Sequence, residues 1–258
     1  MEKKKPRPYF LLSNDDGIEA RGIQYLIEIL RPYADLIVVA PDRARSGASA
    51  SLQISPVTIS EIAHDEGCIQ YACSGTPTDC IKIALQFLCS RKPDVVISGI
   101  NHGANSSISV HYSGTVGAAI EGAIHNIPSL ALSLCDNDTM APLEPCGKVI
   151  KSLIERMTAQ SEILRGHVLN VNIPAVKLIQ GIRICSQGNG SWEHEFEMTE
   201  HDGGEAYQLA GVFEPDARQL PSSDLLWIQK GYATVVPCKI DITHYELMRS
   251  LNDWDCSW

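Results

Sequence analysis

Short apolar runs alternate with amphipathic stretches along the first two-thirds of the chain. The runs lie at residues 9–12, 36–40, 94–98, 130–134 and 167–173. Between the first two, Ile23, Leu26, Ile27 and Leu30 are spaced at i, i+3, i+4 and i+7, which is one apolar face of a helix. Near-continuous apolar runs are typical of strands that are buried on both faces. The alternation therefore predicts an α/β fold with a doubly wound, mostly parallel sheet in three layers, α/β/α.

Further elements follow from local signals. Residues 52–62 and 68–73 read as two short strands, and the strand at 94–98 is expected to end at Gly99. Thr76, Pro77 and Asp79 form the sequence pattern of a capped helix start. Another helix is expected at residues 146–159, and later ones near 222–230 and 243–252.

The pattern changes after Pro174, where alternating segments become shorter and glycine-rich turns and aromatic residues appear. These features are typical of β-hairpins. We therefore expect residues 1–174 to form the core and residues 175–258 to form an extension of hairpins and helices that is packed on it.

Charge and cysteine usage narrow the class of protein. The 258-residue chain has a net charge of −10, which argues against binding to a nucleic-acid duplex or an anionic membrane. Its nine cysteines include no Cys-x-x-Cys pair, so reduced thiols in a cytoplasmic protein are expected. The apolar run near the N-terminus is too short for a signal peptide, and no run is long enough to span a bilayer.

Two adjacent carboxylates, Asp15 and Asp16, lie where the first strand gives way to a helix. Side by side, two carboxylates repel each other unless a cation lies between them. Hard divalent cations prefer such oxygen ligands. The alternative is an ordinary turn in which a carboxylate caps the helix.

Three loops that follow predicted strands carry further oxygen ligands, at residues 14–17, 42–49 and 99–105. Because ligands bind at the carboxyl ends of parallel strands, we expect Asp15, Asp16, Ser46 and Asn101 to lie close together. The set needs no histidine or cysteine, which disfavours zinc and favours magnesium or manganese.

A candidate phosphate site lies at the helix that starts with Ser113, Gly114 and Thr115. Free backbone N–H groups and the helix dipole attract anions there, and the loop that contains Asn105 precedes it. The alternative is that Ser113 and Thr115 are ordinary capping residues. Asp16 is a candidate general base, and His102 is ambiguous between a structural and a functional role.

The ordered motifs resemble those of the SurE family, the stationary-phase survival proteins, over nearly the whole chain. The resemblance is carried by residues 14–17, 40–43, 45–49, 75–80, 98–101 with Gly103 and Asn105, 112–116, 169–174 and 231–243. Departures are Ser107, where the family usually has glycine, Ser109, where it usually has an acidic residue nearby, and residues 236–238.

The resemblance implies a Rossmann-like core and a metal-dependent 5′-nucleotidase that acts on nucleoside monophosphates. It assigns the metal to Asp15, Asp16, Ser46 and Asn101, and it implies one divalent cation per subunit. We expect Asp15, Asp16 and Asn101 to be catalytic, with phosphate held by Asn105, Ser113, Gly114 and Thr115. A metal or nucleotide sensor without turnover, or a transferase on the same scaffold, remains an alternative.

The resemblance also implies that residues 1–174 are the catalytic core and that residues 175–258 serve oligomerisation, in a homodimer or homotetramer that often exchanges C-terminal segments. Aromatic residues after Pro174 support a subunit contact, because they fall in a part with weak periodicity. These residues are Trp192, Phe196, Trp227, Trp254 and Trp258.

Overall fold

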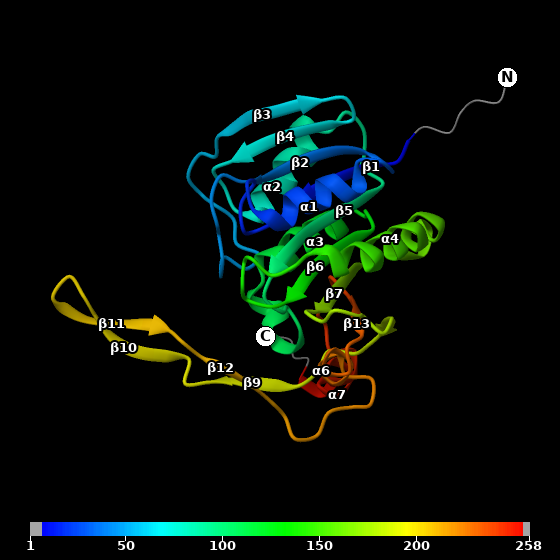
Figure 1. Ribbon diagram of the computed structural model, residues 1–258. Coiled ribbons are helices and arrows are strands. Elements are labelled where there is room, and N and C mark those ends of the chain that lie inside the picture. The colour runs from blue at the N-terminus through cyan, green and yellow to red at the C-terminus, as the bar shows by residue number, and fades with distance from the viewer. Residues whose placement is uncertain (1–6, 255–258) are drawn as a thin grey trace.

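The computed structural model describes residues 7–254 and is built on one nine-stranded sheet (Figure 1). Its strands are β1 (Tyr9–Ser13), β2 (Asp35–Pro41), β3 (Ile59–Asp65), β4 (Cys68–Cys73), β5 (Val95–His102), β6 (Ser129–Cys135), β7 (Val168–Pro174), β8 (Ile182–Ile184) and β13 (Ala233–Cys238). They lie in the order β3-β4-β2-β1-β5-β6-β7-β13-β8.

The central six strands are all parallel. Counted along the chain, β4, β2, β1, β5, β6 and β7 lie in the order 3-2-1-4-5-6, which is the doubly wound arrangement. The strand order reverses between β1 and β5, and ligands bind at the carboxyl ends beside such a reversal. The predicted fold class is therefore confirmed.

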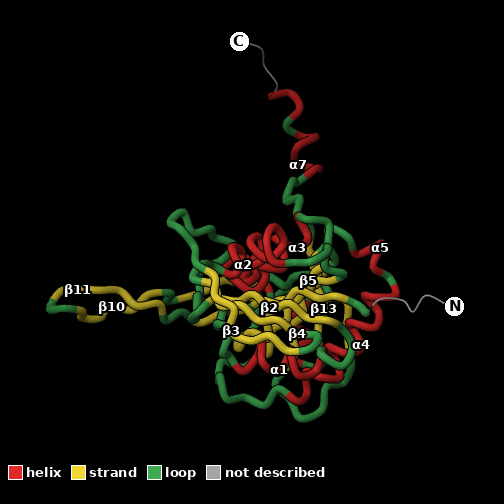
Figure 2. The backbone as a smooth tube through the Cα atoms, turned by 90° about the horizontal axis from the view of Figure 1, so that it is seen from above, coloured by secondary structure: helices red, strands yellow, loops and turns green. Residues whose placement is uncertain are grey.

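Helices cover both faces of the sheet (Figure 2). On one face lie α1 (Arg21–Leu30) and α4 (Glu144–Ala159), whose apolar sides pack on Leu12, Ile97 and Leu132. On the other lie α2 (Pro77–Ile83) and α3 (Gly114–Ile124). Short helices follow at α5 (Ser161–Leu164), α6 (Asp224–Gln229) and α7 (Tyr245–Ser250).

Two predicted boundaries were wrong, and one predicted cap is confirmed. Residues 52–58 form a loop instead of a strand, and β3 covers Ile59–Asp65 at the exposed edge. The strand expected to end at Gly99 continues as β5 to His102, through an irregularity in its pairing with β6. Thr76 and Asp79 form the expected capping box at the start of α2.

The C-terminal part both completes the sheet and leaves it. β13 pairs with β7 and with β8, so the predicted division at Pro174 does not separate two sheets. A ribbon made of β9 (Gly190–Glu193), β10 (Phe196–His201), β11 (Gly204–Leu209) and β12 (Val212–Pro215) projects away from the body (Figures 1 and 2). Within residues 7–254, no helix combines the length and apolar character needed to cross a membrane.

Candidate metal centre

Adjacent strand ends place the two predicted carboxylates at the carboxyl edge of the sheet. Asn14 separates Asp15 and Asp16 from β1, whose last residue, Ser13, pairs with Ser98 of β5. Asn101 lies three residues further along β5. The structure therefore brings these three predicted residues to the reversal of strand order, where a doubly wound sheet binds its ligands.

Asp15 is a buried carboxylate beside the start of α3. It is 5% exposed, and Thr115 donates a hydrogen bond from its hydroxyl to Asp15 Oδ1. A Cβ on Gly114 would lie 2.9 Å from the Cβ of Asp15, so the helix approaches this closely only because residue 114 is glycine. Burial raises the pKa of Asp15 to about 6, the Thr115 hydroxyl opposes that rise, and the charge of Asp16 adds to it.

One carboxylate oxygen of Asp16 is the observation that most directly indicates a cation site. This atom, Oδ2, is buried and, within the described chain, has no hydrogen-bond partner. Burial raises the pKa of this carboxyl as well. A buried carboxylate oxygen without a partner is costly. A hard divalent cation between Asp15 and Asp16 would remove that cost, so the residues present fit such an ion.

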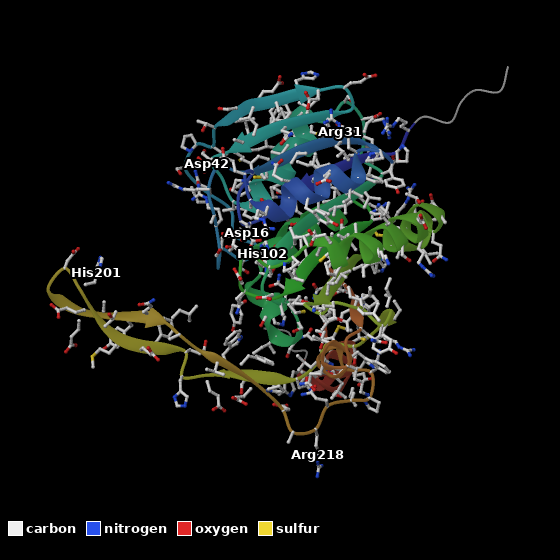
Figure 3. All side chains as sticks on the ribbon, viewed as in Figure 1. Asp16, Arg31, Asp42, His102, His201 and Arg218 are labelled. Carbon is white, nitrogen blue, oxygen red and sulfur yellow. The ribbon has the colours of Figure 1, made fainter. Side chains whose placement is uncertain are left out.

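His102, whose role the sequence left ambiguous, lies close to Asp16. The two are neighbours in Figure 3, with His102 Nδ1 4.0 Å from Asp16 Oδ2. Burial lowers the pKa of His102, and the charge of Arg21 lowers it further. The only signal in the sequence was its place directly after Asn101 in a loop that follows a strand.

Asn101 lies at the end of an irregularity in β5. The pairing between β5 and β6 shifts between Ser98 and Asn101, and a Cβ on Gly99 would lie 2.4 Å from the carbonyl oxygen of Leu132. Asn101 donates from Nδ2 to the carbonyl oxygen of Gly103 at 2.8 Å. Its amide nitrogen is therefore committed, which leaves Oδ1 as the atom that can face a cation.

The loop that carries Ser46 is tied to the first aspartate. Arg45 donates its backbone N–H to the carbonyl oxygen of Asp15 at 2.7 Å. Ser46, the next residue, is exposed. The structure thus brings the loop to the carboxylates, and coordination by the Ser46 hydroxyl stays a prediction.

The predicted ligands at this site all offer oxygen atoms. Among residues 7–254, no group of three or more histidine, cysteine, aspartate or glutamate side chains is placed to hold a metal. A cation here would thus have two carboxylates, with neutral oxygens or water to complete its shell. Such a shell suits Mg²⁺ or Mn²⁺ better than zinc.

The start of α3 has both a capping role and an open role. Ser113 accepts the backbone N–H of Val116 at 3.1 Å, so the capping alternative holds for its hydroxyl. The hydroxyl of Thr115 is given to Asp15. Phosphate binding by Ser113, Gly114 and Thr115 stays a prediction, and it would rest on the backbone N–H groups of the first turn more than on the hydroxyls.

Asn105 is 7% exposed and is held by three side chains. Asn172 accepts its backbone N–H, Asn170 donates to its carbonyl oxygen, and Ser133 accepts from its amide, each at 2.8 Å. Contact between Asn105 and phosphate stays a prediction.

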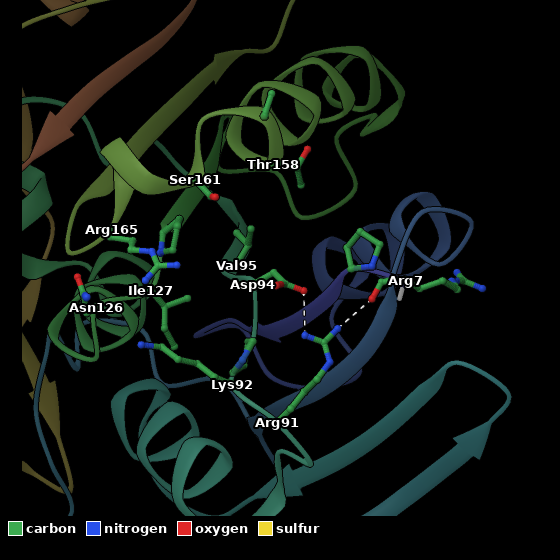
Figure 4. Close-up of a pocket in the computed structure, with 14 residues that line it drawn as sticks. Arg7, Arg91, Lys92, Asp94, Val95, Asn126, Ile127, Thr158, Ser161 and Arg165 are labelled. Carbon is green, nitrogen blue, oxygen red and sulfur yellow. Dashed lines mark hydrogen bonds and ion pairs between the residues drawn. The ribbon is translucent and has the colours of Figure 1, made fainter. Parts of the chain in front are cut away.

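A cavity lies at the opposite edge of the sheet, at the starts of β1 and β5 (Figure 4). Its volume is about 740 Å³, and none of the predicted site residues lines it. Two of the arginines that line it form hydrogen bonds within the chain. Arg91 donates to Asp94 at 3.1 Å and to the carbonyl oxygen of Arg7 at 2.9 Å. Arg7 in turn donates to the carbonyl oxygen of Arg31 at 2.7 Å. The aspartates, and not this cavity, therefore form the candidate site.

Comparison with known proteins finds relatives that match nearly the whole chain. The family described as Survival protein SurE matches residues 10–194. A protein of Phocaeicola vulgatus named 5′-nucleotidase SurE is 42% identical over 254 residues, which is 98% of each chain. One of the same name from Christiangramia forsetii is 44% identical over 264 residues, again 98% of each. The crystal structure of the SurE protein from Aquifex aeolicus superposes with a TM-score of 0.81 at 34% identity, covering 96% of this chain and 99% of that one.

Proposed function

The chain belongs to the Survival protein SurE family and is a 5′-nucleotidase, and we propose that Asp15 and Asp16 hold the divalent cation of that reaction. The observation that carries this proposal is the buried, unpartnered Oδ2 of Asp16 beside the buried Asp15. Asn101 and Ser46 complete the proposed set. Because all four donors are oxygens, the cation is Mg²⁺ or Mn²⁺, one per subunit.

The substrate is a nucleoside 5′-monophosphate, and the reaction is hydrolysis of its phosphate ester. When bound, the cation supplies positive charge that neutralises the phosphate and makes water more acidic. The chain supplies the remaining positioning. Backbone N–H groups at the start of α3 donate hydrogen bonds to the phosphate oxygens, as free N–H groups at a helix N-terminus do. Asn105 lies in the loop that leads into this helix and adds a side-chain donor.

Proton transfer falls to Asp16 or His102. Asp16 is the expected general base, and Nδ1 of His102 lies 4.0 Å from its Oδ2. The lowered pKa of His102 keeps its ring neutral near pH 7, so that it can accept a proton. Asp15, whose Oδ1 is engaged by Thr115, serves the cation and not the proton.

Phosphate release tests the proposed function directly. The purified chain is incubated with a panel of nucleoside 5′-monophosphates, with Mn²⁺ or with EDTA. We expect release that requires the cation. Binding of nucleotide without release would indicate a sensor, and transfer of phosphate to an alcohol without net hydrolysis would indicate a transferase.

We also propose that the chain forms a homodimer or homotetramer through the projecting ribbon, with residues 175–258 as the oligomerisation part. Phe196 pairs with Leu209 and Met198 with Tyr207, and all four side chains are between 62% and 69% exposed. An isolated two-stranded ribbon is marginally stable in water. Burial of this apolar face against a second subunit would stabilise it. Light scattering at micromolar concentration checks this, and a monomer would contradict it.

The aromatic residues expected at this contact divide into two groups. Phe196 and Trp254 are exposed, as a subunit contact requires. Trp192 and Trp227 are half-buried within the chain, where Trp192 packs edge-on against Phe213 at 5.7 Å between ring centroids. Trp258 lies outside the described residues.

We place the protein in the cytoplasm. The eight cysteines that fall within residues 7–254 are all free thiols. Thiols persist in this state in a reducing compartment.

A further inference from the structure

We propose that Asn170 and Asn172 of β7 are positioning residues, which set the orientation of Asn105 toward the phosphate of the substrate. The inference rests on the proposed function, because it assumes a phosphate beside Asn105. Both asparagines are buried, at 2% and 0% exposure, and neither belongs to the predicted metal set. They lie on the same face of β7, since side chains two residues apart in a strand point the same way.

The two side chains hydrogen-bond to the two polar groups of the Asn105 backbone, its N–H and its carbonyl oxygen. Asn172 Oδ1 accepts the N–H of Asn105 at 2.8 Å, and Asn170 Nδ2 donates to the carbonyl oxygen of Asn105 at 2.8 Å. A third bond, from Asn105 Nδ2 to Ser133 Oγ at 2.8 Å, fixes the side chain itself. Backbone and side chain of Asn105 are thus both specified, with one hydrogen of its amide left for a ligand.

The orientation of each amide group, and not only its position, is set by the backbone of Asn105. If the amide of Asn172 were turned over, its nitrogen would face the N–H of Asn105, donor against donor. If the amide of Asn170 were turned over, its oxygen would face the carbonyl oxygen. The peptide of Asn105 therefore requires an oxygen at one position and a nitrogen at the other. This requirement gives the proposal its sharpest test.

Packing alone does not account for asparagine at these two positions. The outer half of each amide is unsatisfied: Asn170 Oδ1 and Asn172 Nδ2 are buried and have no partner within the described chain. An apolar residue would avoid that cost, as Val171 does on the opposite face of the same strand. The hydrogen bonds to Asn105 are the interactions that only asparagine supplies here.

The part of the loop after Asn105 has its own hydrogen bonds, so the two asparagines hold Asn105 alone. Ser107 donates its backbone N–H to Asp224 Oδ2 at 3.2 Å and its hydroxyl to the carbonyl oxygen of Gly188 at 2.9 Å. Loss of one asparagine should therefore displace Asn105 without releasing the whole loop. A displacement of about 1 Å at a positioned group can lower the rate about a hundredfold.

The test compares the same substitution at the two positions. Asn172→Asp keeps an oxygen opposite the N–H, whereas Asn170→Asp puts a carboxylate oxygen against the carbonyl oxygen. Both variants add one negative charge to the same face of one strand. We expect Asn170→Asp to have a kcat/KM about tenfold or more below that of Asn172→Asp, and a correspondingly weaker affinity for inorganic phosphate. Equal values for both constants would overturn the proposal.

Thr234→Val is the matched control. Thr234 of β13 pairs with Asn172 of β7 and is fully buried. Its hydroxyl donates a long hydrogen bond, at 3.5 Å, to the Asn172 carbonyl oxygen. We expect its kinetics to be those of the wild type. The rise in melting temperature with Mn²⁺ should be preserved in the control and in both aspartate variants, since none of them alters a proposed metal ligand.

Neutral variants provide a second test, in case a buried carboxylate unfolds the chain. Asn170→Ala and Asn172→Ala should each lower kcat/KM about tenfold to a hundredfold, but by less than about twofold in an Asn105→Ala background. Additive losses would show a general structural effect and overturn the proposal, as would wild-type kinetics of Asn105→Ala. Loss of Mn²⁺-dependent hydrolysis in the wild type and in Thr234→Val would instead contradict the proposed function itself.

Discussion

Asp15→Asn should make the metal-free protein more stable while it removes activity. Asp15 is 5% exposed, and burial is the main reason that its pKa rises from 3.8 to about 6. A shift of about 2 pKa units corresponds to about 3 kcal/mol against the charged form. The amide avoids this cost, and its Oδ1 can still accept the hydrogen bond from Thr115.

The direction of the pH dependence follows from the raised pKa. The folded metal-free protein binds the Asp15 proton more tightly than the unfolded chain does, so its stability is highest below pH 3.8 and falls as the pH rises through about 6. At pH 8 we expect Asp15→Asn to melt about 6–12 °C above the wild type in EDTA, taking about 2–4 °C per kcal/mol for a chain of this size. The difference should narrow as the pH is lowered toward 4.

The assay is a set of melting curves in EDTA and in Mn²⁺ at several pH values, beside phosphate release. At a hundredfold excess over Kd, Mn²⁺ should raise the free energy of unfolding of the wild type by about 2.7 kcal/mol, and with it the melting temperature. Its effect on Asp15→Asn should be much smaller. The control is Asp202→Asn in the ribbon, where the carboxylate is 92% exposed. The reasoning fails if Asp15→Asn melts with or below the wild type in EDTA at pH 8, or if it keeps the wild-type rate.

Two further substitutions address the supports of the site. Thr115→Val removes the hydroxyl that binds Asp15, so kcat/KM should fall by about one to three orders of magnitude and half-maximal activity should need more Mn²⁺; wild-type kinetics would make Thr115 a packing residue. Asp224→Asn leaves one oxygen where Ser107 and Gly188 donate to two, so unfolding should become easier by about 1–3 kcal/mol in a denaturant titration, and an unchanged midpoint would contradict this.

The sequence by itself determined the fold class and which loops meet at the carboxyl edge of the sheet. Buried parallel strands need apolar side chains on both faces, so β2 and β6 appear as apolar runs without any tertiary information. Parallel strands expose their carboxyl ends at one edge, so residues that follow β1 and β5 meet there by topology alone. The capping box at Thr76 and Asp79 was likewise predictable, since it depends on residues three apart.

Only the tertiary structure decided how the polar residues of the site are divided among tasks. Thr115 and Asn105 were both expected at the phosphate, but the hydroxyl of Thr115 is given to Asp15, 100 residues away, and Asn105 is gripped from β7. Hydrogen bonds between residues so far apart leave no periodicity in the sequence. The same holds for β5, which continues beyond Gly99 and passes close to Leu132 of the neighbouring strand there. Local patterns record which face of an element is buried, whereas the partner of a buried polar atom is set by packing between distant segments.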